Sequence, residues 1–496
     1  MAAYAKKNLN HYALVFKRTG EPQNIVHAEK PPITPVEIPS RPSAFAKELQ
    51  TVPAGPAPEV VIPDYDREIV KTSLDGGFVL YSAKNTENER FRLRFVFPAG
   101  TYNDPLLGLA MGYAEVADTE QRPQSDFNRE LYTLALDLNF YSGTLETVIT
   151  ISGLQRNLPR ALELLSERIA KMKSDPAVWR KLADRIEKAR ENSRKNPNAL
   201  MSASVSYALY GGADNPFRNE VPMETIRRIK ADELTEMLRN LPYYPHDVVY
   251  YGPGDPAEVA KLVEKNFKPD PGKRPAFKPL RKFKIRPAAE NIVYKVDIPG
   301  RTQIQIMLIR TDEIAIPGNT VRERLFSRYA GQLAFSQLRE KQSLGYLAGA
   351  WYSIPGILPD NYSYFGVVLG TQADKLETGL GAMLNFADSM PRDRNLFLAS
   401  KANVLGILRS ARTKKEFLYD EKKALLRMKQ PLDSRLRDCR AIEKMPPEAF
   451  FSDAEKHMKN GRNLLILSGD LKSIRPGLLE QFGRVVELTP DMIFVK

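Results

Sequence analysis

Cysteine and histidine are scarce in this sequence. Its 496 residues include one cysteine, Cys439, and four histidines. One cysteine cannot form an internal disulfide, and this supply of thiols excludes a cysteine-rich structural zinc site. No two histidines stand four residues apart, so no helix can offer two imidazoles to a metal ion from one face. Glycine-rich phosphate loops and the Gly-x-Ser-x-Gly nucleophile motif are also absent.

Long apolar runs are missing as well. No run approaches the about 18 residues that a membrane helix needs, and the first residues contain no apolar core like that of a signal peptide. Hydrophobic residues make up 43% and charged residues 27%, an ordinary balance for a globular protein with a sizeable core. The net charge of +13 suggests either an acidic partner such as nucleic acid or, as we favour, a simple excess spread over a large surface.

Proline is concentrated near the start of the chain. Residues 21–65 hold 10 of the 37 prolines, which remove backbone donors and favour extended structure. We therefore expect a linker there. Before it, Tyr12–Phe16 has the composition of a short buried strand.

After residue 66 a series of strand and helix patterns occurs twice. Phe91 and Gln303 lie in the opening strands and are 212 residues apart, while Val248 and Leu464 begin the closing strands and are 216 apart. Matching order and length indicate an internal duplication. Tyr12–Phe16 resembles a third closing strand, so we expect it to end an upstream unit. Strands are expected at 91–97, 144–151, 248–255, 302–309, 347–352 and 464–470, and helices at 105–118, 123–138, 158–174, 176–195 and 320–341.

One corner of the second repeat could carry chemistry. Thr320 and Glu323 form a capping-box pattern that starts a helix, and Gly345 is suited to a left-handed stop after it. Arg339 then lies in the last helical turn and Tyr346 at the first position of the next strand. Such a corner can aim a guanidinium and a phenol at one point. The alternative is a helix-end cation and a half-buried tyrosine.

These residues carry a family resemblance. The segment from Arg339 to Tyr346 resembles the Arg-x-x-x-x-x-Gly-Tyr signature in the carboxy-terminal half of pitrilysin/insulinase-family zinc metallopeptidases. Gly108-Leu-Ala110 is similar to the start of that family's metal helix, Gly-Leu-Ala-His-x-x-Glu-His. Asn196-Pro-Asn, Asn215-Pro-Phe and Tyr243-Tyr-Pro also follow the family's order of landmarks.

The zinc motif itself is lost. Met111, Ala114 and Glu115 stand where the family has its two metal histidines and its catalytic glutamate. Methionine and one carboxylate cannot make the usual zinc site, and alanine cannot take a proton from water. Glu187 and Glu191 fall near the place of a third ligand. We expect no metal and no cofactor in this chain, with zinc in a partner half.

The resemblance implies an α+β fold of two homologous units, each a mostly antiparallel sheet covered by helices, as in one half of a metallopeptidase clamshell. The expected organisation is the closing strand of an absent upstream unit (1–20), a proline-rich linker (21–65), a degenerate peptidase-like unit (66–275), a basic connector (276–287) and a second unit with the Arg/Tyr motif (288–496).

Three functions compete at this stage. The first is the non-catalytic half of a zinc metalloendopeptidase, inactive alone, which closes over a peptide or unfolded protein and supplies Arg339 and Tyr346. The second is an inactive family member that acts as a binding or assembly scaffold. The third, a nucleic-acid binder, would use Lys278, Arg281, Lys282, Lys284 and Arg286, but this cluster lacks a stacking platform and is expected to be a solvated linker. The favoured compartment is the periplasm, with the cytoplasm as the alternative.

Overall fold

The computed structural model describes residues 43–53, 55–267, 275–315, 320–354, 361–429, 433–459, 461–472 and 474–495. The chain divides into two compact units, residues 1–56 and 57–496. In the first unit, α2 (Ala44–Thr51) begins after Ser43, whose side chain accepts a hydrogen bond from the Ala46 amide at 3.1 Å. The expected linker therefore contains a helix. The expected strand at 12–16 lies outside the described residues.

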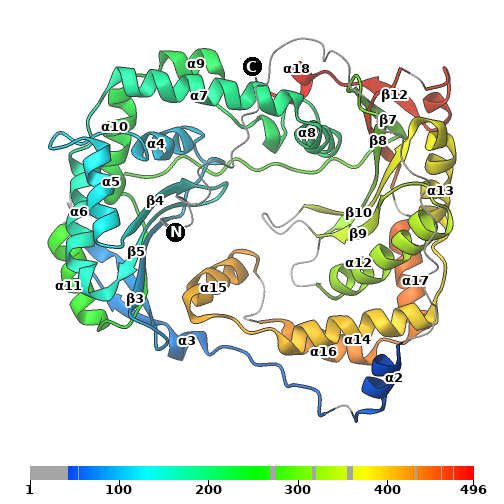
Figure 1. Ribbon diagram of the computed structural model, residues 1–496, viewed down its shortest axis with the longest axis horizontal. Helices are drawn as coiled ribbons and strands as arrows, with labels where there is room; N and C mark the ends of the chain where they lie inside the picture. The colour runs from blue at the N-terminus through cyan, green and yellow to red at the C-terminus, as the bar shows by residue number, and fades with distance from the viewer. Residues whose placement is uncertain are drawn as a thin grey trace, which may run out of the picture. The chain divides into compact units, whose positions relative to one another are not determined.

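The second unit contains two six-stranded sheets (Figure 1). The first has the order β1-β2-β6-β3-β5-β4, and the second has the order β12-β7-β11-β8-β10-β9. The strands of the first sheet are β1 (Val70–Ser73), β2 (Val79–Lys84), β3 (Arg90–Phe97), β4 (Asp137–Ser142), β5 (Thr147–Leu154) and β6 (Asp247–Gly252). Those of the second are β7 (Ile292–Asp297), β8 (Gln303–Ile314), β9 (Leu347–Ser353), β10 (Tyr362–Gln372), β11 (Leu464–Gly469) and β12 (Arg484–Glu487).

The two sheets share one plan. The run β2-β6-β3-β5-β4 matches β7-β11-β8-β10-β9 in order and direction, with one parallel pair followed by three antiparallel pairs. Only the outer strand differs, because β1 is antiparallel to β2 whereas β12 is parallel to β7. The expected α+β fold of two repeated, mostly antiparallel sheets is confirmed.

Helices cover both sheets. Those of the first region are α3 (Tyr65–Glu68), α4 (Leu106–Ala114), α5 (Gln124–Thr133), α6 (Leu158–Ala170), α7 (Pro176–Lys195), α8 (Pro197–Tyr210), α9 (Met223–Arg228), α10 (Ala231–Asn240) and α11 (Pro256–Asn266). Those of the second region are α12 (Thr320–Ala334), α13 (Leu376–Asp388), α14 (Arg394–Ser410), α15 (Leu418–Arg427), α16 (Arg435–Lys444), α17 (Pro447–Met458) and α18 (Pro490–Ile493), together with a π-helical turn, η5 (Phe335–Lys341).

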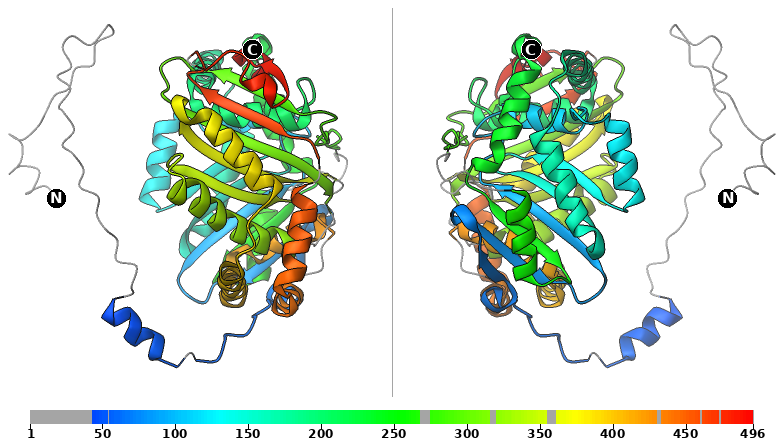
Figure 2. Two further views of the ribbon diagram at one scale, coloured as in Figure 1. Left: turned by 90° about the vertical axis from the view of Figure 1, so that its right-hand side faces the viewer. Right: turned by 90° about the vertical axis from the view of Figure 1, so that its left-hand side faces the viewer.

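Each sheet has its own apolar core. In the first, Phe91, Leu93 and Phe95 of β3 pack with Ala110 of α4 and Leu162 of α6. In the second, Leu369 of β10 packs with residues of α12, α13 and α17, and the left view of Figure 2 shows α12 and α13 lying across that sheet. Burying a large apolar side chain contributes about 1.5–3 kcal/mol, so these two cores dominate the stability of the fold.

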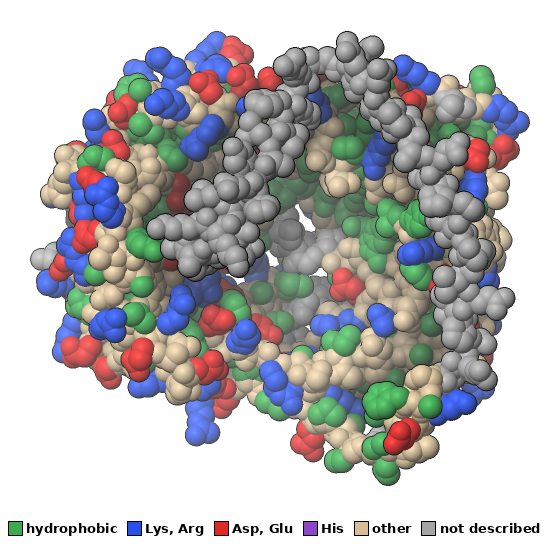
Figure 3. Space-filling model, viewed as in Figure 1, with side chains coloured by type: hydrophobic (Ala, Val, Ile, Leu, Met, Phe, Trp, Pro, Cys, Tyr) green, Lys and Arg blue, Asp and Glu red, His purple; other side chains and the backbone are tan. Residues whose placement is uncertain are grey.

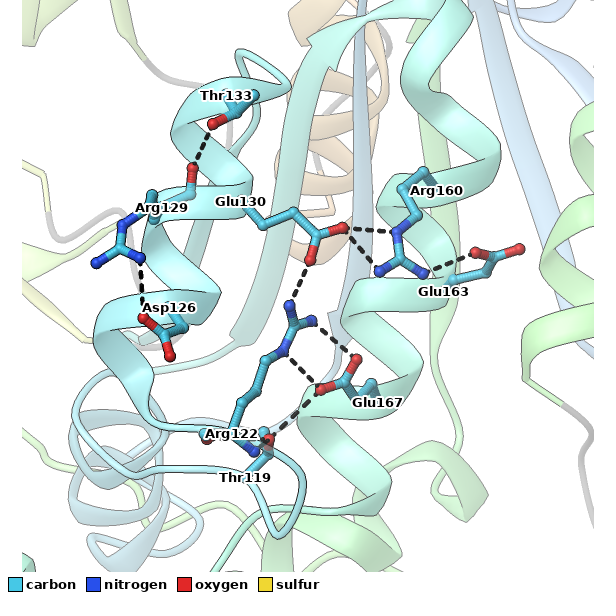
Figure 4. A network of polar contacts seen from close by, with 9 residues as sticks. All are labelled: Thr119, Arg122, Asp126, Arg129, Glu130, Thr133, Arg160, Glu163 and Glu167. Atoms are coloured by element: carbon cyan, nitrogen blue, oxygen red, sulfur yellow. Dashed lines mark hydrogen bonds and ion pairs between the residues drawn. The ribbon is translucent and has the colours of Figure 1, made fainter.

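A polar network holds α5 to α6 on the surface (Figure 4). Arg122 donates to Glu167 through Nε at 3.0 Å and Nη2 at 2.9 Å, and it also pairs with Glu130. Arg160 joins the same Glu130 at 2.7 Å. Because Glu130 lies on α5 and Glu167 on α6, Arg122 fixes the separation of the two helices.

Each of the two repeats packs one helix against the sheet of the other repeat. Leu200, Met201 and Leu209 of α8 pack in one apolar cluster with residues of β7, β8 and β11 in the second sheet. Conversely, Tyr419 of α15 packs with Val96 and Val249 of the first sheet. Both helices directly follow a long helix, α7 or α14, so they occupy equivalent places in the repeat. These two contacts tie the two sheets together.

The basic connector is anchored rather than solvated, which corrects the sequence-based expectation. Phe283 and Ile285 are 2% and 3% exposed, and the Phe283 ring lies 4.7 Å from the ring of Tyr102. The Ile285 amide donates to the side chain of Asn361 at 2.8 Å. Apolar residues between the lysines and arginines therefore hold the connector against the protein while the cations point outward.

Candidate functional site

Arg339 lies in the last turn of the helix, as expected, but this turn is not α-helical. The α12 helix ends at Ala334 and continues as the π-helical segment η5. The Arg339 guanidinium carbon lies 4.5 Å from the centre of the Phe335 ring, a cation–π contact. Single π-turns inside helices are frequent at functional sites because they change the direction of the following side chains.

The turn after η5 is held by hydrogen bonds, and it corrects the expected role of Gly345. Ser343, with φ +49°, takes the left-handed conformation predicted for Gly345. Glycine is nonetheless required at 345, because a Cβ there would lie 1.6 Å from the Gly370 carbonyl oxygen. The Thr371 hydroxyl donates to the Leu344 carbonyl at 2.7 Å, and this bond fixes the turn against β10.

Tyr346 is placed by this turn just before β9, the edge strand of the second sheet. Its side chain is 85% exposed, so the alternative of a half-buried structural tyrosine is wrong. Among the described residues, β9 pairs with β10 alone, and Tyr346 therefore lies next to the edge of the sheet.

Arg339 and Tyr346 line one open pocket, which we call the Arg/Tyr pocket. Its volume is about 580 Å³, and Gln303, Ser343, Thr371 and Lys375 are also among its lining residues. Gln303 begins β8, while Lys375 precedes α13. Neither residue was singled out from the sequence, because each comes from a segment distant from the motif.

The residues at the lost zinc motif do not fit a zinc ion. Met111 and Ala114 are buried in α4 at 2% and 0% exposure. The Glu115 carboxylate accepts a hydrogen bond from the Phe140 amide at 2.6 Å, and burial raises its pKa. Arg168 donates to the Ala114 carbonyl at 2.6 Å, and burial lowers the pKa of this arginine to about 10. The described groups at this end of α4 are thus a carboxylate and a buried guanidinium, and the three motif positions offer neither an imidazole nor a thiolate.

The expected third-ligand positions lead to the same conclusion. Glu187 of α7 pairs with Arg227, and Glu191 is exposed. A cavity of about 640 Å³ does lie between α4 and α7, but its only acidic lining residue among those described, Glu220, pairs with Arg190 at 3.1 Å. Nothing in this cavity resembles a set of zinc ligands.

The structure does bring one set of metal-ligand types together that sequence reasoning missed. Donor atoms of Asp312, Glu313 and His457 lie within 4.8 Å of one another. However, His457 Nδ1 lies 2.7 Å from Asp312, the Tyr352 hydroxyl donates to the same carboxylate, and Arg322 binds Glu313 at 2.8 Å. Protein groups thus engage all three, which describes a polar network that runs from the buried His457 to the exposed Glu313. No spacing in the sequence signals it, because β8 and α17 are far apart in the chain.

The basic connector has acidic neighbours. Lys278 lies 2.6 Å from Asp104 and Arg281 lies 2.9 Å from Asp214. In Figure 3, positive and negative side chains are interspersed on the face shown. Among the described residues, no helix is long and apolar enough to cross a membrane.

Comparison with known proteins identifies the fold. No family model matches the chain. Subunit 2 of the mitochondrial cytochrome b-c1 complex from Neurospora crassa is 26% identical over 193 residues, a match that spans 38% of this chain and only 42% of that relative. An inactive domain of a peptidase M16 from Pseudomonas fluorescens has a TM-score of 0.62 at 17% identity, covering 82% of this chain and 99% of that one. The periplasmic protease PqqL from Escherichia coli has a TM-score of 0.61 at 15% identity, covering 88% of this chain and 49% of that one.

The chain therefore has the fold of one half of a pitrilysin-like peptidase, and its structural neighbours include an inactive peptidase domain. The resemblance drawn from Arg339, Tyr346 and the altered metal helix is confirmed. The chain spans about half the length of PqqL.

Proposed function

We propose that this chain is the non-catalytic half of a zinc metallopeptidase, which closes over an extended peptide and contributes Arg339 and Tyr346 to the reaction. One observation carries the proposal. The guanidinium of Arg339 and the phenol of Tyr346, a residue that is 85% exposed, line the same open pocket, just before the edge strand β9.

The chemistry of the two side chains suits peptide hydrolysis. Zinc, held by the partner half, would supply Lewis acidity. During hydrolysis, negative charge develops on the former carbonyl oxygen of the peptide, and the Tyr346 hydroxyl would donate a hydrogen bond to it. Arg339 would hold a peptide carbonyl or orient Tyr346. Neither side chain can act in the reaction unless the partner half supplies the zinc, so the chain is expected to be inactive alone.

Mixing the chain with its zinc-bearing half and a peptide substrate tests the proposal. Tyr346→Phe should lower kcat by roughly 10²-fold, as the loss of an oxyanion donor does, while leaving folding intact. Arg339→Ala should cost a similar factor, part of it in KM. Lys341→Ala, an exposed change on the same turn but outside the pocket, is the control and should have little effect.

The second candidate function is a binding or assembly scaffold. It is supported by the likeness to a cytochrome b-c1 subunit, a relative whose name describes a complex rather than a hydrolase. A scaffold has no chemical need for both Arg339 and Tyr346. Full activity of both variants at unchanged unfolding free energy would favour the scaffold. The likeness to a periplasmic protease supports the proposal of a periplasmic location.

A further inference from the structure

The charged residues described in the lining of the Arg/Tyr pocket are both positive. Arg339 and Lys375 both line it, and among the described residues that line it there is no aspartate or glutamate. The remaining lining groups are mainly hydroxyls, amides and backbone. The pocket thus contains hydrogen-bond donors and two cations, and no described carboxylate in the pocket offsets their charge. The chain as a whole has 60 aspartates and glutamates.

The two cations keep their charge available to a ligand. Within the described part of the chain, neither Arg339 nor Lys375 has a carboxylate at ion-pair distance. Arg339 rests on the Phe335 ring at 4.5 Å, and Lys375 donates to the Ser343 carbonyl at 3.0 Å. Both contacts position the charged group without neutralising it. About half of the other described cations of the second repeat do have a carboxylate partner, for example Arg475 with Glu377 at 3.0 Å.

The backbone at the start of α13 adds to the positive electrostatic potential of the pocket. Lys375 immediately precedes Leu376, where the 13-residue helix α13 begins. The amino-terminal end of a helix carries a partial positive charge that favours an anion nearby. Gln303 and Ser343 add neutral hydrogen-bonding groups along the wall of the pocket.

From these contacts we infer that the Arg/Tyr pocket is a carboxylate subsite, which selects peptides with an acidic group placed beside the bond held at Tyr346. The inference rests on the proposed function, because it names the peptides that this site prefers. A carboxylate from an Asp or Glu side chain and one from a peptide C-terminus offer the same chemistry. Arg339 and Lys375 would bind it through charge-assisted hydrogen bonds.

The test measures binding of short fluorescein-labelled peptides to the full chain by fluorescence anisotropy. The peptides contain alanine, threonine and valine around one central Glu or Gln, and each is made with a free or an amidated C-terminus. One charge-assisted hydrogen bond corresponds to roughly a tenfold change in Kd. The Glu peptide, the free-acid peptide or both should therefore bind about tenfold more tightly than the neutral amide, and the pattern identifies the source of the carboxylate.

Lys375→Gln should reduce this preference to about twofold while the Kd of the neutral amide stays unchanged. Arg339→Gln should also reduce the preference, but it should weaken the binding of all four peptides as well, because the proposed function gives Arg339 a peptide carbonyl to hold. Lys341→Gln is the matched control and should retain the preference, since Lys341 is exposed and lies outside the pocket. Equal binding of all four peptides to the unaltered chain overturns the inference but leaves the proposed function standing. A preference that survives both pocket variants also overturns it, because the carboxylate then binds elsewhere. Failure to bind any peptide overturns the inference, because the pocket of this chain then holds no carboxylate, whereas the proposed function is decided separately by the hydrolysis assay with the zinc-bearing half.

Discussion

At the scale of single residues, the site depends on close contact between two glycines. Gly345 packs against the Gly370 carbonyl so closely that a Cβ would lie 1.6 Å from that oxygen. The contact fixes where the chain enters β9, and hence where Tyr346 stands. The sequence showed a glycine before a tyrosine, but the reason for it lies on β10, which no local pattern connects to this turn.

Gly345→Ala should therefore destabilise the protein. Relieving the clash requires backbone movement, and overpacking of this kind typically costs about 1–3 kcal/mol. Equilibrium unfolding in urea measures the change. Gly381→Ala is the control: no atom lies within 4 Å of its added Cβ, and alanine in a helix interior is favoured over glycine by about 0.5–1 kcal/mol. An unchanged unfolding free energy for Gly345→Ala would contradict the packing argument.

Glu115 gives the fold a pH dependence of known sign. Burial raises its pKa in the folded state, so the native protein holds this proton more firmly than the unfolded chain does. Stability should fall as pH rises from the ordinary carboxyl pKa through the raised folded value, and the penalty persists above it. Glu115→Gln keeps an oxygen for the Phe140 amide without the charge.

The Gln variant should accordingly be more stable than the unaltered chain near neutral pH, and the difference should vanish in acid, where Glu115 is protonated. Thermal unfolding across pH measures this crossover. Glu448→Gln, on a side chain that is 82% exposed, should change stability by no more than about 0.5 kcal/mol at any pH. A Glu115→Gln variant that is less stable near neutral pH would mean that attraction to Arg168 outweighs burial.

At the scale of elements, long segments with strong patterns were predictable and short or irregular ones were not. The helix expected at 176–195 is α7 over the same residues, and the strand at 91–97 is β3. The helix expected at 123–138 was wrong at its end, because α5 stops at Thr133 and β4 begins at Asp137. β4 and β1 are short edge strands with mixed burial, so their sequences carry little periodicity.

The contact that α8 makes with the second sheet differs in chemistry from the contact that α15 makes with the first sheet. The contact of α8 with the second sheet is apolar, whereas α15 meets the first sheet largely through ion pairs. Arg94 of β3 binds Asp420 through two hydrogen bonds of 2.7 and 2.8 Å, and Lys423 and Tyr419 both bind Asp247. The α15 contact is therefore the one that salt should weaken.

Asp420→Asn should lower the unfolding free energy by about 1–2 kcal/mol, because it leaves the nearly buried Arg94 charge without its partner. The exposure of Asp420 itself, 36%, keeps the loss below that of a fully buried pair. Urea unfolding at low and high ionic strength measures both the loss and its reduction by salt. Asp66→Asn also removes an α15 ion pair, to Lys422, but Asp66 is 78% exposed, so this variant should lose less stability than Asp420→Asn. Equal effects of the two variants would contradict a special role for Arg94.

At the scale of the whole molecule, the duplication relates the altered metal motif of the first repeat to the Arg/Tyr pocket of the second. The matching strand order shows one plan used twice, and the sequence spacings of 212 and 216 residues revealed it in advance. The place of the metal motif in that plan is filled by Met111, Ala114 and Glu115, with Arg168 bound to the same helix end. The Arg/Tyr pocket belongs to the other repeat. Under the proposed function, such a chain would need zinc from a partner half to take part in hydrolysis.

The isolated chain should consequently hold no stoichiometric zinc and hydrolyse no peptide, because no group of residues at the altered motif has the ligand types that zinc requires. Metal analysis after incubation with zinc and desalting checks the first point, and the zinc-bearing half serves as the positive control. About one zinc retained per chain would contradict the expectation. His457→Ala then decides the cause, since loss of the metal in this variant would place it at the network of Asp312, Glu313 and His457. Retention of zinc by His457→Ala would instead indicate a zinc site at Glu115 and the helix α4.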